Sequence, residues 1–266
     1  MKAEIIAIGT ELLLGQILNS NAQYLSQQCA DMGIDVYFQT VVGDNAARLK
    51  EAFSLAAGRA DLVLCTGGLG PTQDDLTKDA LSELLDRPLL VDRTAEERIA
   101  GTFRARGIQM VESNIRQAHL LAGGDTLPND TGMAVGMGLT HEGTHFVVLP
   151  GPPKEMKPMF EHYAVPWILS KMPDSSPLYS KMLKFAGIGE SLLEHQLIDL
   201  IDGQTDPTIA PYAKEGEVTI RLSSKAKSRE EAFRKIESVE SEIRKRLGDY
   251  IYAEQDISLE SALVAS

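Results

Sequence analysis

Short apolar runs alternate with amphipathic stretches through roughly the first two thirds of the chain. Runs such as 3–8 and 62–65 are largely apolar, which is typical of buried strands, whereas 46–57 repeats apolar positions at helical spacing. This alternation of strand and helix predicts a doubly wound, mostly parallel α/β sheet. The predicted strands are residues 3–8, 36–42, 62–65 and 144–149, and the predicted helices are residues 20–32, 46–57, 78–85, 92–106 and 153–171.

The pattern of predicted strands and helices changes after the turn-rich segment 173–177, which we interpret as a linker. Strands and helices now follow the order β-α-β-β-α-β, which predicts a small split α+β domain. A capping box formed by Ser228 and Glu231 indicates where its long second helix begins. The predicted organisation is a first domain over residues 1–172, a second over 178–253, and a linker with the start of a further helix over 254–266.

Composition restricts the class of protein. The 266 residues are 43% hydrophobic and 24% charged, as is usual for a globular protein, and the length favours two domains. A net charge of −12 disfavours a general nucleic-acid binder, which needs a basic surface. Cys29 and Cys65 form no CxxC pair and are expected to be buried free thiols, which fits a reducing cytoplasm. We expect a cytoplasmic protein, because the sequence shows no signal peptide and no apolar run of membrane-spanning length.

Three loops of the first domain directly follow predicted strands. Residues 9–11 follow the first strand, residues 67–75 the third, and residues 151–155 the strand that ends at Leu149. In open parallel sheets, ligands bind outside the carboxyl ends of the strands. The three loops are therefore expected to gather at one edge of the sheet and to form one ligand site.

The loop after the third strand carries the strongest chemical signal. It runs Thr66-Gly67-Gly68-Leu69-Gly70-Pro71-Thr72 and is followed by Asp74 and Asp75. Its glycines allow a close approach by a ligand, and the next helix presents unpaired N–H groups to an anion, so the loop suits a phosphate. Two acids would repel a bare phosphate, and this conflict predicts that Asp74, Asp75 or both hold a hard divalent cation. The alternative is that both acids merely complement the helix dipole.

Each remaining polar residue of these loops allows a structural as well as a functional interpretation. Glu11 is a solvated acid, a general base or a second metal ligand. Thr77 supports the loop or the metal, or is an ordinary helix residue, and Glu155 is either a site residue or a first-turn acid. Asn19 and Asn21 are expected to cap a helix and to pack.

With these residues identified, essentially the whole chain resembles the CinA family, named after competence/damage-inducible protein A. The first domain is similar to molybdopterin-binding domains of the MoaB, Mog and gephyrin type, and the second to the KH-like module of the family. The most specific motif is the Gly-Gly-Leu-Gly-Pro-Thr segment of residues 67–72. The other matching segments are residues 8–12 with Gly15 and 19–21, residues 74–77, Asn129 with Gly132, and residues 149–156, 187–191 and 210–218.

The resemblance implies an ADP-ribose pyrophosphatase in the first domain that releases AMP and ribose 5-phosphate. It implies dependence on a divalent metal such as Mg²⁺, help from potassium, and a homodimer. We expect a small nucleotide as partner, and neither nucleic acid nor membrane. Residue chemistry and resemblance together make Asp74, Asp75 and Glu11 catalytic, with Asp74 and Asp75 also binding the metal. The expected substrate-binding residues are Gly9, Thr10, Thr66, Gly67, Gly68, Gly70, Pro71, Thr72, Asn129, Gly132, Gly151, Pro152, Pro153, Glu155 and Lys214.

Two alternatives to an enzyme stay open. The loops could hold a molybdopterin or a nucleotide without turnover. The chain could also be a dimerising scaffold for the nicotinamide mononucleotide deamidase domain that many family members carry at their carboxyl end. Residues 258–266 resemble only the first helix of that domain, so the resemblance implies a truncated form or a natural short member.

The sequence of the KH-like module gives little indication that it binds nucleic acid. RNA-binding KH modules use a GXXG loop, and residues 187–189 do not match that motif. Lys214, at the tip of a predicted hairpin, is either a solvated lysine or, in the context of the family, a contact to the substrate phosphate.

Overall fold

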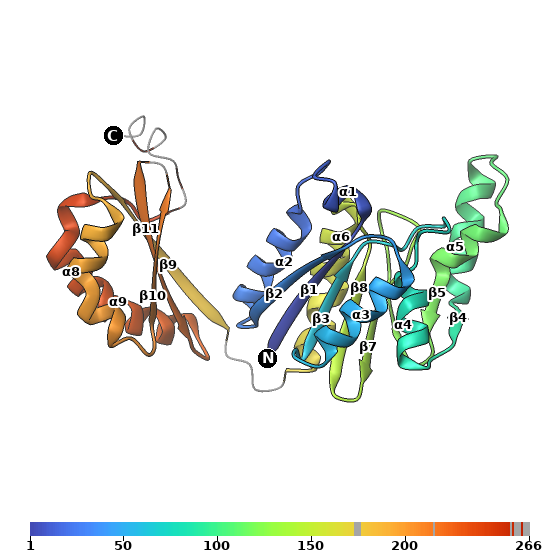
Figure 1. The fold of residues 1–266 in the computed structure, drawn as a ribbon, viewed down its shortest axis with the longest axis horizontal. Helices are drawn as coiled ribbons and strands as arrows, with labels where there is room; N and C mark the ends of the chain where they lie inside the picture. Colours follow the sequence, from blue (N-terminus) through green and yellow to red (C-terminus); the bar gives the residue numbers. More distant parts are fainter. Residues whose placement is uncertain (173–176, 215, 256, 258–261, 263–266) are drawn as a thin grey trace. The chain divides into compact units, whose positions relative to one another are not determined.

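The computed structural model describes residues 1–172, 177–214, 216–255, 257 and 262. The chain forms two compact units, of which the first comprises most of residues 1–174 and the second most of residues 175–266 (Figure 1). Most of the predicted linker and of the predicted tail helix lies outside the described residues.

Six strands form the sheet of the first unit, in the order β2-β1-β3-β8-β7-β6. Neighbours among β2, β1, β3 and β8 pair in parallel, and β7 and β6 extend the sheet in antiparallel fashion. The prediction of a doubly wound, mostly parallel sheet is confirmed. The strands are β1 Lys2–Ile8, β2 Asp35–Val42, β3 Leu62–Thr66, β6 Asp125–Leu127, β7 Gly136–His141 and β8 Thr144–Leu149.

Helices cover both faces of this sheet. Side chains of α3, α4 and α5 join one face in a common core that includes Phe53, Leu81 and Phe146. Helices α2 and α6 lie on the opposite face (Figure 1), where Tyr24 packs edge-on against Phe160 with ring centroids 6.2 Å apart. The α-helices are α1 Thr10–Leu13, α2 Ser20–Asp31, α3 Ala46–Ala57, α4 Thr77–Leu85, α5 Arg93–Ala105, α6 Pro153–Met159 and α7 Val165–Ser170.

Several features of the first unit differ from the sequence-based expectation, including helix α1 and strand β6, which were not predicted. The predicted helix over residues 153–171 is divided by a π-helical turn, η2 Phe160–Ala164, which precedes Pro166. Proline has no N–H to donate, so regular α-helical bonding is interrupted near this residue. The residues after α5 form the 3-10 helix η1 Glu112–Ala118 and a small two-stranded sheet of β4 Leu89–Val91 and β5 His119–Leu121, neither of which was predicted.

The second unit is a four-stranded antiparallel sheet in the order β10-β11-β9-β12, with two helices packed on it. The predicted order β-α-β-β-α-β is confirmed, and the Ser228 hydroxyl caps the long second helix by accepting a hydrogen bond from the Glu231 N–H at 3.2 Å. Its elements are β9 Leu178–Ala186, α8 Glu190–Asp202, β10 Thr208–Lys214, β11 Glu217–Lys225, α9 Arg229–Leu247, the 3-10 helix η3 Gly248–Tyr250 and β12 Ile251–Ala253.

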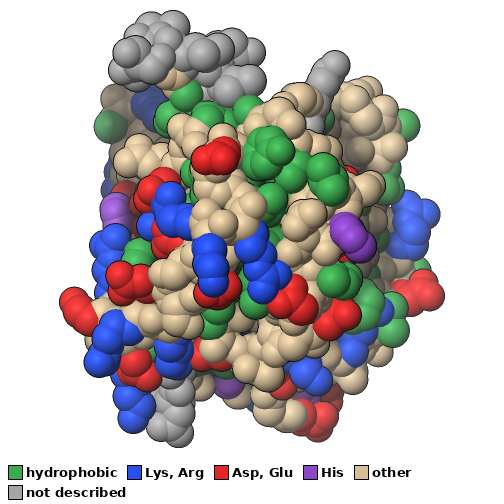
Figure 2. All heavy atoms as spheres, turned by 90° about the vertical axis from the view of Figure 1, so that its left-hand side faces the viewer, with side chains coloured by type: hydrophobic (Ala, Val, Ile, Leu, Met, Phe, Trp, Pro, Cys, Tyr) green, Lys and Arg blue, Asp and Glu red, His purple; other side chains and the backbone are tan. Residues whose placement is uncertain are grey.

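The surface of the second unit seen in Figure 2 mixes charges. Basic side chains lie among acidic ones on this face, which carries α8 and α9, instead of gathering in one basic patch. Within the described ranges, no helix is both long and apolar enough to cross a membrane. Cys29 and Cys65 are buried free thiols, as predicted, and burial raises the pKa of both.

Candidate functional site

The three predicted loops leave neighbouring strands at the same edge of the sheet. Thr66, the last residue of β3, is in register with Ala7 of β1 on one side and with Leu149 of β8 on the other. The Gly67 N–H continues this pairing with a 3.0 Å hydrogen bond to the Leu149 carbonyl oxygen. Parallel strands of equal register end together, so their following loops converge.

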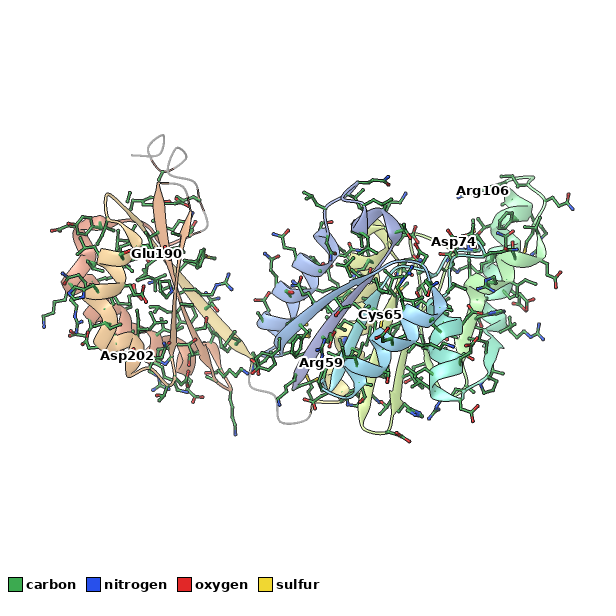
Figure 3. All side chains as sticks on the ribbon, viewed as in Figure 1. Arg59, Cys65, Asp74, Arg106, Glu190 and Asp202 are labelled. Carbon is green, nitrogen blue, oxygen red and sulfur yellow. The ribbon has the colours of Figure 1, made fainter. Side chains whose placement is uncertain are left out.

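A cavity of about 360 Å³, which we call the acidic cavity, lies where these loops meet. No Lys, Arg or His side chain is among the described residues that line it. Figure 3 places Cys65 within the sheet and Asp74 beyond the end of the strands. Part of the lining is the glycine-rich loop, through Gly67, Gly68 and Gly70. Five residues with carboxylate side chains also line the cavity and make it acidic: Glu11, Asp44, Asp74, Asp75 and Glu155.

Gly67 shows why the loop after β3 needs glycine. Its φ of +112° is rarely adopted by other residues, and a Cβ on Gly67 would lie 2.1 Å from the carbonyl oxygen of Ile8. The loop after β3 therefore lies directly against the backbone at the end of β1. The Thr77 hydroxyl reinforces this turn by donating a 2.8 Å hydrogen bond to the Gly67 carbonyl oxygen, so Thr77 supports the loop.

The two adjacent acids of this loop have different environments. The carboxylate of Asp75 accepts the backbone N–H of Thr72 at 2.9 Å and also the Thr72 hydroxyl. Asp74, in contrast, is exposed at the acidic cavity. Helix α4 begins at Thr77 after Leu76, which makes no side-chain cap hydrogen bond, so neither acid caps this helix.

Asn129 and Gly132 hold Glu155 in place. The Asn129 side-chain nitrogen donates to Glu155 Oε2 at 2.9 Å, and its oxygen accepts the Gly132 N–H at 2.7 Å. A Cβ on Gly132 would lie 1.9 Å from the same Glu155 oxygen. Arg98 supports the segment by donating to the carbonyl oxygens of Asn129 and Gly132 at 2.7 and 2.8 Å. Asn129 and Gly132 thus act on the cavity through Glu155.

Asp44 is a lining residue that the sequence analysis missed. Its carboxylate accepts the Thr10 N–H at 2.9 Å and the Thr10 hydroxyl at 2.8 Å, and so joins the loop after β2 to the loop after β1. The available signal was its place after a strand, in the segment Gly43-Asp44-Asn45. Arg116 was missed as well, and it donates to the Asp75 carbonyl oxygen at 2.9 Å and to Asp79 at 2.7 Å.

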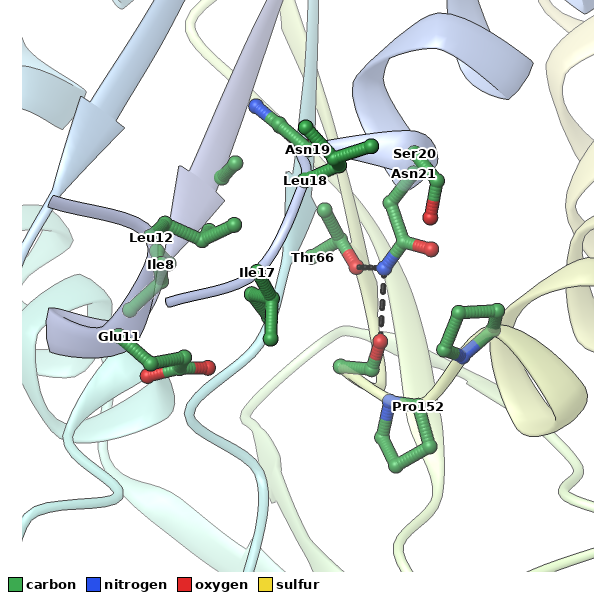
Figure 4. A pocket seen from close by; sticks show the side chains of 13 residues that line it. Ile8, Glu11, Leu12, Ile17, Leu18, Asn19, Ser20, Asn21, Thr66 and Pro152 are labelled. Carbon is green, nitrogen blue, oxygen red and sulfur yellow. Dashed lines mark hydrogen bonds between the residues drawn. The ribbon is translucent and has the colours of Figure 1, made fainter. Parts of the chain in front are cut away.

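A second cavity, of about 280 Å³, adjoins the first (Figure 4). We call it the apolar cavity. The two cavities share four lining residues, including Glu11 and Pro152. Glu11 is the one charged side chain among the described residues that line the apolar cavity. The rest of its lining is mainly aliphatic and proline side chains, together with Asn19, Ser20, Asn21 and Thr66.

The structure brings together most, though not all, of the predicted site residues. Thr10, Pro71, Thr72, Asn129 and Gly132 line neither cavity, and all of these except Pro71 bond to or contact residues that do. Thr66 lies at the apolar cavity, where its hydroxyl donates to the Pro150 carbonyl oxygen at 2.8 Å. Pro153 also lines the apolar cavity, and Gly151 and Pro152 line both. Lys214 belongs to the second unit, and its side chain lies outside the described part of the chain.

The side chains at the acidic cavity can be compared with those that the expected divalent metal needs. Among the described residues, no three His, Cys, Asp or Glu side chains are grouped so that they could hold an ion by themselves. Mg²⁺ usually keeps several waters and is held by one or two carboxylates together with substrate phosphates. The exposed Asp74 carboxylate and its neighbours at the acidic cavity fit this open mode of binding.

The two units match two different family models. Residues 4–170 match the model described as "Probable molybdopterin binding domain", and residues 180–253 match "Damage-inducible protein CinA KH domain". The crystal structure of the protein CinA with unknown function from Thermoplasma acidophilum is similar as well. It has 28% sequence identity and a TM-score of 0.58, and the match covers 62% of this chain and 98% of that chain.

Full-length relatives agree with these models. A CinA-like protein of Dictyoglomus turgidum is 53% identical over 264 residues, which are 99% of this chain and 64% of the relative. A CinA-like protein of Dictyoglomus thermophilum is 52% identical over 264 residues, again 99% of this chain and 64% of the relative. The chain thus spans about 64% of the length of these curated relatives. On the evidence of its two domains and of these relatives, the chain belongs to the CinA family.

Proposed function

We propose that the acidic cavity hydrolyses the pyrophosphate bond of ADP-ribose or a related nucleotide, with a divalent cation such as Mg²⁺ and with potassium as a helper. The observation that supports this is the combination of a glycine-rich loop, which suits phosphate, with five carboxylates and no basic side chain among the described lining residues. A diphosphate is repelled by such a cavity unless a cation accompanies it, so ligand and cation are expected to bind together.

The reaction needs one water molecule. Its oxygen attacks one phosphorus atom, the bridging P–O bond breaks, and AMP and ribose 5-phosphate leave. A divalent cation, when bound, would neutralise phosphate charge. Asp74 is the residue best placed to hold it, because its carboxylate is exposed at the acidic cavity. Glu11, which lies at the junction of the two cavities, is the candidate to take the proton from the attacking water.

A second candidate is ligand binding without turnover. The match of residues 4–170 to a molybdopterin-binding model favours this reading, since it shows a related fold and says nothing of hydrolysis. We also propose that the chain forms a homodimer and serves as a scaffold for a further domain. Light scattering on the purified chain measures whether it is a dimer.

Turnover of ADP-ribose separates these candidates. We expect the protein to release AMP and ribose 5-phosphate from ADP-ribose when Mg²⁺ is present, and chromatography measures this release. The release should stop when EDTA is added. Asp74→Asn should slow release about a hundredfold while the protein remains folded. Binding of ADP-ribose without any metal-dependent release would exclude the hydrolase and leave the binding module.

A further inference from the structure

We infer that strand β2 Asp35–Val42 is the interface between two copies of this chain, and that it pairs antiparallel with itself about a two-fold axis at Gln39. The inference rests on the homodimer that we propose above and goes beyond it, because it assigns the surface and the strand register. It does not depend on the proposed hydrolysis.

Strand β2 is the outer strand at one end of the six-stranded sheet (Figure 1). Its inner side pairs with β1, and among the described residues no strand pairs with its outer side. An edge of this kind presents unpaired N–H and C=O groups, which form a template for another strand. With eight residues, β2 is long enough to support a continuous ladder of hydrogen bonds.

The other ends of the two large sheets are protected against such pairing. Strands β6 and β12 have three residues each, and β10 contains Pro211, which has no N–H to donate. Residues 36–42 of β2, in contrast, read Val-Tyr-Phe-Gln-Thr-Val-Val and contain no proline, glycine or charged residue. The outer side of β2 thus lacks the usual features that keep an edge strand from pairing, which indicates that another strand covers it.

Exposed apolar side chains and the distribution of charge favour a second copy as the partner. Tyr37, Phe38 and Val41 are 65%, 44% and 36% exposed, so one strand presents three apolar side chains to water. The chain has a net charge of −12, and two copies therefore repel each other except where an uncharged surface meets its like. Residues 36–42 are such a surface. Antiparallel pairing is also symmetric, so the donors of each copy meet the acceptors of the other.

The direction of the backbone groups sets the register. The Val42 carbonyl oxygen accepts the Gly9 N–H at 3.0 Å, so the backbone groups of Val42 face β1. Because these groups alternate along a strand, those of Val41 and Gln39 face outward. Gln39 is also the central residue of the uncharged run 36–42. A two-fold axis at Gln39 therefore pairs the whole run with itself and places each Gln39 opposite its copy.

Charge substitutions at Gln39 test this register on the whole chain. Gln39→Lys would place two lysines opposite each other, and Gln39→Glu would do the same with two glutamates. We expect each variant to raise the dimer dissociation constant at least about tenfold, as light scattering over a dilution series measures. An equal mixture of the two variants should restore the dimer, because lysine then lies opposite glutamate. This recovery would also show that both variants are folded.

Gln109→Lys is the matched control. Gln109 is exposed and follows α5, which lies on the side of the first unit away from β2 (Figure 1). The same change of side chain is made there outside the inferred interface, so the dissociation constant should stay within about twofold of that of the unmodified protein.

Cross-linking tests the contact between the two copies independently of affinity. Gln39→Cys would place two thiols on facing residues, whose Cα atoms lie about 5.5 Å apart in such a ladder. A short bismaleimide should therefore join them into a covalent dimer on a denaturing gel. Cys29 and Cys65 are buried, so the unmodified protein should not be cross-linked, and Gln109→Cys should also remain a single chain on the gel.

The outcomes separate this inference from the proposals on which it rests. A monomeric unmodified chain would overturn both the homodimer and the interface. A dimer that tolerates both charge variants, that does not recover in their mixture, or that leaves Gln39→Cys uncross-linked would overturn the interface and keep the homodimer. Turnover of ADP-ribose is measured separately, and its absence would remove the hydrolase and leave the interface.

Discussion

Thr72 donates both its backbone N–H and its hydroxyl to one carboxylate oxygen of Asp75, and this pairing separates two acids that are neighbours in the sequence. Asp75 is thereby engaged in shaping its own loop. Asp74 remains exposed at the acidic cavity. The two acids are therefore expected to respond differently to substitution.

Asp74→Asn is expected to reduce ADP-ribose turnover about a hundredfold, as removal of a group that offsets transition-state charge often does. Its thermal unfolding midpoint should not change, because the carboxylate is exposed. Steady-state rates and scanning fluorimetry measure both. Asp86→Asn is the control, since Asp86 is an exposed acid that lines neither cavity, and its turnover should equal that of the unmodified protein. Normal turnover in Asp74→Asn would move the metal site elsewhere.

Asp75→Ala is expected to lower the free energy of unfolding by about 1 kcal/mol, because the Thr72 N–H and hydroxyl lose their shared acceptor. Urea denaturation measures this change. Thr72→Val, which keeps the N–H bond and removes the hydroxyl, should give a smaller loss. An Asp75→Ala protein as stable as the parent would show that this pairing does not stabilise the loop.

Gly132→Ala is expected to impair turnover more than stability. The new Cβ would lie 1.9 Å from Glu155 Oε2, and a flexible carboxylate can move away from it at little cost in folding. Glu155 would then leave Asn129 and shift within the acidic cavity. Gly101→Ala in α5 is the control, because nothing lies closer than 3.9 Å to its added Cβ. That variant should gain roughly 0.5–1 kcal/mol of stability with unchanged rates. A fully active Gly132→Ala would contradict the role given to Glu155.

Lys78 makes stability depend on pH. Its ammonium group is buried and donates to the Val135 carbonyl oxygen at 2.7 Å, and burial lowers its pKa to about 7 from the ordinary 10.5. Between these two values the unfolded chain binds the Lys78 proton and the folded chain does not. The free energy of unfolding therefore rises with pH across this window, by at most about 1.4 kcal/mol per pH unit from this group.

The comparison that isolates this effect uses Lys78→Met. We expect the stability of the unmodified protein relative to this variant to increase between pH 7 and pH 9.5, as followed by denaturant unfolding at each pH. Lys50→Met is the control, since Lys50 is a surface lysine paired with Glu83 at 2.7 Å and should show no such trend. A constant difference between the unmodified protein and Lys78→Met at all pH values would mean that Lys78 keeps its proton throughout.

Removal of divalent metal is expected to stop turnover and to leave the fold intact. Within the described ranges no group of His, Cys, Asp and Glu side chains could hold a structural ion, so EDTA should not change the thermal unfolding midpoint. Addition of Mg²⁺ should restore turnover. A fall of several degrees in the midpoint on chelation would reveal a structural metal instead.

The amino-acid sequence by itself determined much that depends on near neighbours in the chain. Helix α3 occupies residues 46–57 as the apolar spacing predicts, with Asn45 as its cap, and the glycine-rich loop lies between a strand and a helix. Such features depend on local hydrogen bonds and on the period of the apolar residues, which can be read from a short window. The expectation that three strand-ending loops share one edge followed from the parallel order alone.

Tertiary structure decided what each polar side chain does. Asp44 and Thr10, 34 residues apart, join two loops, and Asn21 bridges to Gly151 across 130 residues. The sequence did not distinguish Asp74 from Asp75, and it did not show that the Asn21 side chain bonds to both Thr66 and Gly151. Roles of this kind depend on which distant donors and acceptors meet, and on what burial leaves unpaired, and only the folded chain fixes both.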